Sequence, residues 1–130
     1  MRYLAAILAL GATSPVKWFI ILYFNANCLY MIEAVLSASQ SKDKKYKVIV
    51  SDGTREKTIH FGAKGYQDYT IHGDDRRKAA YLERHRSAEN WSDPFTAGFW
   101  AVHALWNQKT LVASLADIRK RYNIKIQSLV

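Results

Sequence analysis

Residues 60–107 read HFGAKGYQDYTIHGDDRRKAAYLERHRSAENWSDPFTAGFWAVHALWN. Glycines, paired aromatic residues and charged residues recur through this stretch at short spacings. A plain solvated helix would not need so many glycines next to tyrosines and tryptophans, because glycine weakens a helix and marks turns. The pattern therefore predicts a compact, specifically packed module in which turns alternate with helices.

A β-hairpin is predicted at the start of this module. Tyr46–Val50 (YKVIV) and residues 56–61 (EKTIHF) alternate apolar and polar side chains, as strands with one buried face do. The pair Asp52–Gly53 between them favours a tight turn, because such a turn needs positive backbone torsions that glycine adopts freely. Gly62 and Gly65 are then expected to end the second strand and turn the chain.

Two or three helices are predicted after the hairpin. Residues 75–86 (DRRKAAYLERHR) begin with an acid, which suits the positive end of a helix dipole. Asp93 and Pro94 predict a second helix start, in which a capping side chain precedes the proline favoured at the first helical position. A last helix is predicted from about residue 112 to 122, and the alternating end IKIQSLV (124–130) can add a strand. The fold class predicted is α+β.

The first 36 residues are the strongly apolar part of the chain, broken by Pro15 and Lys17. Residues 37–45 (SASQSKDKK) are small, polar and charged, which predicts an exposed linker. The predicted organisation is therefore an apolar N-terminal segment (1–36), a linker (37–45) and a small basic module (46–130).

Several interpretations of the apolar segment stay open. It anchors the chain in a membrane, which is the favoured interpretation, or it forms two short helices that pack on partner proteins, or it is a signal peptide that is removed. A spanning helix from Tyr3 to Phe24 would be long enough, but Lys17 inside the bilayer would cost roughly 2.5 to 3.5 kcal/mol. A further alternative is that Met31 is the true start and the residues before it are an extension.

The charge and the aromatic content favour binding to an anionic partner. The net charge is +8 and the sequence pI is about 9.7, which suits nucleic acid, a lipid surface or an acidic protein. Four Trp, eight Tyr and five Phe give a short chain the contact area that interfaces use. A single cysteine excludes an intramolecular disulfide framework and a cysteine-rich zinc site.

The sequence predicts no enzyme, no metal site and no cofactor. The four histidines lie 12, 13 and 18 residues apart, whereas zinc-binding histidines usually come in close pairs. The glycine-containing HFGAKG lacks the GKS or GKT ending of a phosphate-binding loop, and no GxSxG motif is present. The histidines, interpreted as surface or structural residues, are His60, His72, His85 and His103.

A partner interface is predicted where basic residues alternate with aromatic ones. Trp100 is chosen because it lies off the helical stripe of Phe95, Phe99, Val102 and Trp106, so that its ring is free for a partner. The same basic residues also allow phosphate contacts with nucleic acid, although acidic neighbours on the helix compete for them. The predicted interface residues are Arg76, Arg77, Arg84, Arg86, Trp91 and Trp100.

The stretches HFGAKGYQDYT, YLERHR, ENWSDP, TAGFW and LWN resemble a small uncharacterised protein family of large nucleocytoplasmic double-stranded DNA viruses of algae and protists. The resemblance covers roughly Tyr46 to Tyr122. It implies a structural role as a minor capsid protein on the inner face of the virion shell. The implied partners are the major capsid protein, other minor capsid proteins and the internal viral membrane. A nucleic-acid-binding accessory protein of such a virus is the first alternative, and an enzyme with an unrecognised histidine site is the second.

Overall fold

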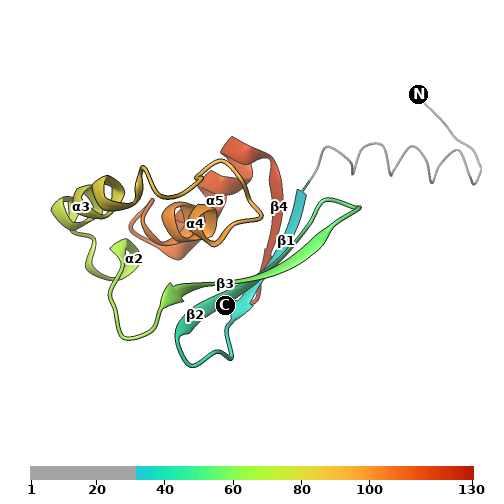
Figure 1. Cartoon of the computed structure of the whole chain (residues 1–130), viewed down its shortest axis with the longest axis horizontal. Helices are drawn as coiled ribbons and strands as arrows, with labels where there is room; N and C mark the ends of the chain where they lie inside the picture. Colours follow the sequence, from blue (N-terminus) through green and yellow to red (C-terminus); the bar gives the residue numbers. More distant parts are fainter. Residues whose placement is uncertain (1–31) are drawn as a thin grey trace, which may run out of the picture.

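The computed structural model describes residues 32–130, which form an α+β domain (Figure 1). The predicted α+β class is confirmed, and so are the hairpin, the helix near residue 75, the last helix and the C-terminal strand. In chain order the elements are β1 (Ile32–Ala38), β2 (Lys44–Ser51), β3 (Glu56–Ala63), α2 (Tyr69–His72), α3 (Asp75–His85), α4 (Ala97–Trp100), the π-helical segment η2 (Ala101–Leu105), α5 (Leu111–Tyr122) and β4 (Ile124–Ser128).

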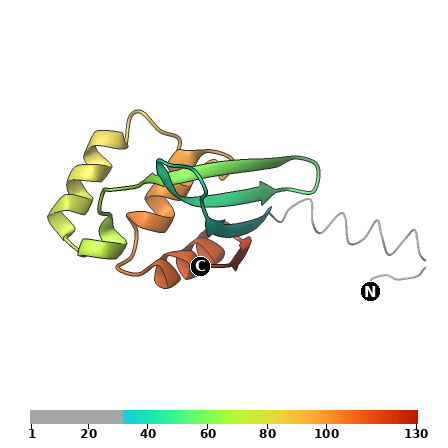
Figure 2. The same cartoon turned by 90° about the horizontal axis from the view of Figure 1, so that it is seen from below.

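Within residues 32–130 the strands form one four-stranded sheet in the order β3-β2-β1-β4. β1 pairs antiparallel with β2 and parallel with β4, so the first and last strands lie side by side. Because side chains alternate between the two faces of a strand, every second residue points toward the helices. Figure 2 shows the strands together on one side, with α2 and α3 beyond the end of the sheet. The apolar residues of the covered face are Ala34, Leu36, Val48, Val50, Ile59, Phe61, Ile124 and Ile126.

The turn between β2 and β3 follows from the Asp52–Gly53 pair. Gly53 has φ 95°, which an L side chain rarely adopts. The Asp52 carboxylate accepts hydrogen bonds from the backbone N–H groups of Thr54 (2.9 Å) and Arg55 (2.8 Å). These hydrogen bonds lower the pKa of Asp52 below its usual value. Turn geometry and local capping therefore set where the two strands pair.

The predicted start of the module at residue 46 is wrong, because β1 already begins at Ile32. Residues 37 and 38 belong to β1, and residue 44 begins β2, so the predicted linker contributes only the turn between two paired strands. Ser39 in this turn is buried, and its N–H donates to the carbonyl of Lys45 (3.0 Å). A short apolar strand in the middle of a sheet has the same composition as a buried helix segment, so the sequence pattern does not separate β1 from the apolar residues before it.

The membrane-anchor, two-helix, signal-peptide and Met31-start interpretations rest mainly on residues 1–31, which lie outside the described residues. Among the helices of residues 32–130, none has the length and apolar character needed to cross a membrane.

The predicted helix start at Asp93 and Pro94 is also wrong. α4 begins at Ala97, and Thr96 is its N-cap, with the Thr96 hydroxyl accepting from the N–H of Phe99 (3.3 Å). The Asp93 carboxylate instead accepts from the N–H of Phe95 (3.0 Å) in the turn before the helix. Both Asp93 and Thr96 are good capping residues, but the helix begins after Thr96, with Phe99 in the core.

Trp100 is fully buried, which contradicts the prediction that its ring is free for a partner. Its indole N–H donates to the carbonyl of Pro94 (2.7 Å), and its ring centroid lies 6.3 Å from that of Phe61 on the sheet. The stripe predicted from the sequence requires one regular α-helix, whereas η2 follows α4 directly. A π-helical turn holds more residues than an α-helical one, so the periodicity of 3.6 does not hold here.

Candidate partner-binding groove

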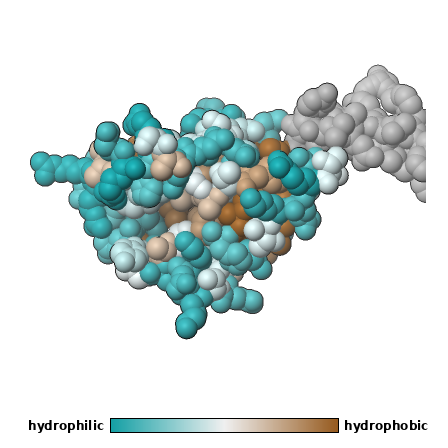
Figure 3. Space-filling model, viewed as in Figure 1, coloured by the Kyte–Doolittle hydropathy of each residue, from teal (hydrophilic) through white to brown (hydrophobic). Residues whose placement is uncertain are grey.

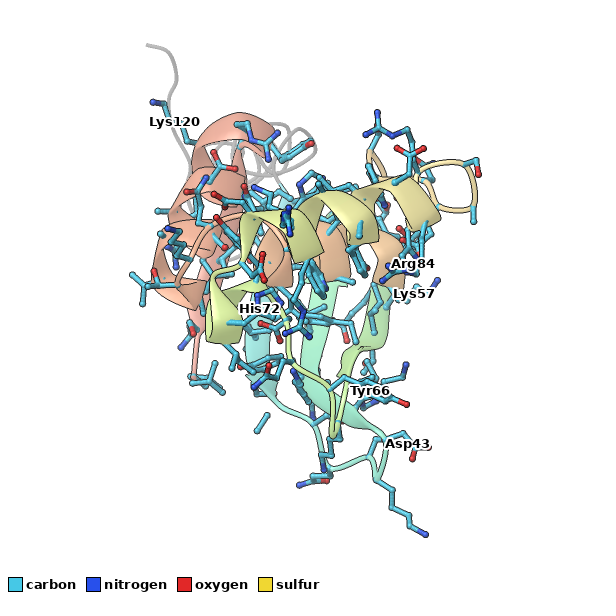
Figure 4. All side chains as sticks on the ribbon, turned by 90° about the vertical axis from the view of Figure 1, so that its left-hand side faces the viewer. Asp43, Lys57, Tyr66, His72, Arg84 and Lys120 are labelled. Atoms are coloured by element: carbon cyan, nitrogen blue, oxygen red, sulfur yellow. The ribbon has the colours of Figure 1, made fainter. Side chains whose placement is uncertain are left out.

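An open groove of about 570 Å³ lies between the end of β3, the loop that leads to α2, and helices α3 and α4 with η2. Figure 3 shows this face of the molecule hollowed near its middle, with more hydrophobic residues inside the hollow and hydrophilic residues around it. In Figure 4, Arg84 beside α3 and Tyr66 in the loop below it lie in front of the strands. Several lining residues are small, among them Ala80, Ala97 and Gly98, which leaves space between the elements.

A stack of three rings forms the apolar part of the groove. The Tyr81 ring from α3 lies 4.3 Å from the ring of Trp106 and nearly parallel to it (5°). On α3 itself, the His85 ring lies 4.2 Å from that of Tyr81. Residues four apart share one face of a helix, which is why Tyr81 and His85 meet. Burial, with a smaller contribution from the charge of Glu89, raises the pKa of Tyr81 to about 12. Tyr81 therefore stays a neutral aromatic surface at any physiological pH.

An ion pair between β2 and the loop before α2 closes one wall. The Lys45 ammonium lies 2.7 Å from the Asp68 carboxylate, whose side chain is 5% exposed. The same carboxylate caps α2 by accepting from the N–H of Thr70 (3.0 Å). Lys45 neutralises a carboxylate that would otherwise be buried with an uncompensated charge, so this wall adds little net charge to the groove.

Glu89 organises the opposite wall. Its carboxylate accepts from His85 Nδ1 (3.1 Å) and from the indole N–H of Trp91 (3.1 Å). Gly98 allows Glu89 to approach α4, because a Cβ at Gly98 would lie 3.1 Å from atoms of the Glu89 side chain. Trp91 is thereby held half-buried beside the groove, and its polar group is satisfied within the chain.

The rim of the groove is positively charged and carries one exposed aromatic ring. Lys44, Arg77 and Arg84 are exposed lining residues, and in residues 32–130 none of them forms an ion pair. Arg77 is oriented by a hydrogen bond to the side-chain oxygen of Gln67 (3.2 Å). Tyr66 is 73% exposed. Three free cations around an aromatic floor favour a ligand that has both negative charge and apolar groups.

The predicted interface residues are only partly brought together. Arg77 and Arg84 line the groove, whereas Arg76 and Arg86 are exposed on the same helix outside its lining. Trp91 contacts Glu89, and Trp100 lies in the core, as described above. Sequence reasoning missed Lys44, Tyr66, Tyr81 and Trp106 as groove residues. Only the i, i+4 spacing of Tyr81 and His85 could have indicated part of this surface.

The four histidines do not converge. His60 bonds to Ser39 Oγ (2.8 Å), His72 Nδ1 accepts from the N–H of Asp74 (2.9 Å), and His85 contacts Glu89. In the part of the chain that the structure describes, no three His, Cys, Asp or Glu side chains come close enough together to hold a metal ion. Each histidine has a structural contact of its own.

His103 is the buried member of the four. Its Nε2–H donates to the carbonyl of Trp91 (2.8 Å), and its Nδ1 accepts from the Arg121 guanidinium (3.2 Å). Asp117 pairs with Arg121 (2.8 Å), and the Tyr122 hydroxyl lies 3.2 Å from Nε2. Burial is the main cause that lowers the pKa of His103. The geometry assigns a neutral imidazole that joins η2 to α5 and to the segment around Trp91.

Residues 34–85 match a family model described as "Family of unknown function (DUF5754)". The match runs from β1 to the end of α3 and includes the edge of β3, the Asp68 loop and Tyr81 of the groove. No curated protein and no solved structure matches the chain.

Proposed function

We propose that this chain is a non-enzymatic binding module of a virion, a minor capsid component that holds neighbouring capsid subunits together. The binding role is supported by one observation above all: Tyr66 is 73% exposed at the rim of a groove that is also lined by three exposed cations without ion pairs, Lys44, Arg77 and Arg84. Tyrosine, tryptophan and arginine are the residue types that interfaces favour, and the groove brings an exposed tyrosine and two exposed arginines to one face.

The virion placement is supported by the resemblance of the sequence motifs given above. In this proposal the partners are the major capsid protein and other minor capsid proteins, at the inner face of the shell. The apolar residues that precede Ile32 would supply the link to the internal membrane. The groove would contact the capsid subunits, since it lies in the module and not in that segment.

A direct test is cross-linking from the groove in particles purified from the virus that carries the gene. Tyr66 is replaced by a photoreactive phenylalanine analogue, and the products are identified by mass spectrometry after mild detergent and salt fractionation. The matched control places the same analogue at Val112 of α5, which is 78% exposed and lies outside the groove. We expect cross-links to the major or a minor capsid protein from position 66 and few from position 112. Absence of the chain from particles, or recovery with the genome core, would overturn the proposal.

A nucleic-acid-binding accessory protein is the second candidate. The observation in its favour is that Lys44, Arg77 and Arg84 line the same groove as the exposed ring of Tyr66, so that phosphates and a stacked base could be contacted together. Phosphate contacts strengthen as salt falls, so tight oligonucleotide binding at low salt that weakens steeply with added salt would favour this candidate. Weak binding even at low salt would remove it.

A further inference from the structure

The groove follows the free edge of a strand. β3 is the outermost strand of the sheet, and among residues 32–130 no strand pairs with its other side. Four consecutive residues of β3, 60–63, line the groove. Gly62 has φ 79°, so the regular alternation of side chains breaks in this stretch, and Lys44 and Lys45 at the start of the paired strand β2 line the same space. The groove therefore reaches the end of β3, next to the unpaired edge of the sheet.

The two edges of the sheet differ in what occupies them. At β4 the Arg119 guanidinium donates to the carbonyl of Ile126 (3.0 and 3.3 Å), which caps an outward-facing acceptor. At β3, the carbonyl of Ala63 accepts a hydrogen bond from the N–H of Tyr66 (3.4 Å). Within the described part of the chain, the backbone of residues 60–63 makes no other hydrogen bond besides those to β2. An edge with free N–H and C=O groups is a template on which another strand can pair.

The wall opposite this edge is helix α3. Arg77, Tyr81 and Arg84 lie three and four residues apart and thus on one face of α3, and all three line the groove with the small side chain of Ala80 between them. A space bounded by a strand edge on one side and a helix on the other is the arrangement in which an extended peptide can add a strand. Alternate side chains of such a peptide would point toward the Tyr81 and Trp106 rings.

The charged residues that line the groove indicate which kind of ligand it can bind. Lys44, Arg77 and Arg84 are free cations, whereas the two lining carboxylates are already engaged, Asp68 by Lys45 and Glu89 by His85 and Trp91. We infer that the groove binds an extended acidic segment of a partner protein, which adds a strand to the free edge of β3. This inference rests on the proposed binding role, and it names the chemistry and the geometry of the partner. Nucleic acid could meet the same cations but would leave the strand edge unused.

The test uses the full chain and a displayed library of random twelve-residue peptides. Enriched peptides are synthesised with a fluorescent label, and their Kd is measured by fluorescence polarisation. We expect acidic sequences and a rise in Kd of about tenfold for Arg77→Glu and for Arg84→Glu, because each reversal replaces an attraction by a repulsion. The neighbouring variants Arg76→Glu and Arg86→Glu, on the same helix outside the groove, should change Kd by less than about twofold.

Backbone methylation of the peptide isolates the strand pairing. N-methylation at single positions should raise Kd more than about tenfold at every second residue and little at the residues between, because only alternate N–H groups of a strand face its neighbour. Of the amides of residues 60–63, only those that face away from β2 should gain protection from hydrogen exchange when the peptide binds. A library that yields no binder, methylation effects without a period of two, equal effects of Arg76→Glu and Arg77→Glu, or tighter binding of an oligonucleotide would each overturn the inference.

These outcomes are separate from those of the particle experiment. Cross-links from position 66 to capsid protein, together with peptides that are insensitive to methylation, would retain the proposed function and remove the strand addition. Peptides that pair with β3, together with absence of the chain from particles, would retain the strand addition and remove the virion role.

Discussion

Replacing Trp100 by alanine should remove a large part of the stability of this domain. The side chain is fully buried, and a buried aromatic residue removes roughly 150 to 250 Å² from water. At about 25 cal/mol per Å² this burial corresponds to roughly 4 to 6 kcal/mol, and measured Trp→Ala changes in cores cost about 3 to 5 kcal/mol. The variant also leaves the carbonyl of Pro94 without its indole donor. We expect a loss of about 4 kcal/mol in the free energy of unfolding.

Urea unfolding followed by circular dichroism measures this loss, with thermal unfolding as a second readout. A domain of this size loses roughly 4 to 8 °C of Tm per kcal/mol, so Tm should fall by about 20 °C. Trp100→Phe, which keeps a ring but loses the bond to Pro94, should cost about 2 kcal/mol. Tyr66→Ala is the control, because its exposed ring should contribute less than about 0.5 kcal/mol. If Trp100→Ala stayed within about 1 kcal/mol of the parent chain, the placement of Trp100 in the core would be wrong.

Three further predictions concern the sheet, the buried histidine and the groove wall. Gly62→Ala should lower the free energy of unfolding by about 1 to 2 kcal/mol more than Gly53→Ala, measured by urea unfolding. Both glycines have positive φ, but only a Cβ at Gly62 would lie 2.9 Å from a side-chain atom of Leu105. Equal losses in the two variants would contradict this close approach. Because the pKa of His103 is lowered in the folded state, the unfolded chain binds that proton more tightly, and stability should fall as pH drops below about 6.5 through the folded pKa, by at most about 1.4 kcal/mol per pH unit. His103→Gln should flatten urea-derived stability between pH 7 and 5, and an unchanged slope would show that another group controls it. Lys45→Met should lower the free energy of unfolding by about 2 kcal/mol because it leaves Asp68 buried without its cation. The control Lys44→Met, at the exposed neighbouring residue, should cost less than about 0.5 kcal/mol. Thermal unfolding compares the two variants, and similar Tm values would mean that the ion pair contributes little to stability.

Local signals in the sequence were sufficient for several elements. The hairpin turn at Asp52–Gly53 and the start of α3, where the Asp74 side chain accepts from the N–H of Arg76 (2.9 Å), both depend on atoms only a few residues apart. The alternation of β2 and β3 and the period of α5 follow from one buried face each. These features need no knowledge of the rest of the chain, so the α+β class could be predicted.

Only the tertiary structure decided the place of β1, the burial of Trp100 and the existence of the groove. β1 and β4 are the first and last strands of the described domain, and they pair with Ile32 opposite Ile124. No local sequence pattern specifies a partner that is so distant along the chain. Trp100 reaches the core because a π-helical segment follows α4, and the composition of the helix does not reveal that change of period. The groove combines β3, the Asp68 loop, α3 and α4, and its shape depends on how far apart packing holds them. A sequence determines local backbone preferences directly, whereas the spacing between distant elements is settled only when their side chains pack together.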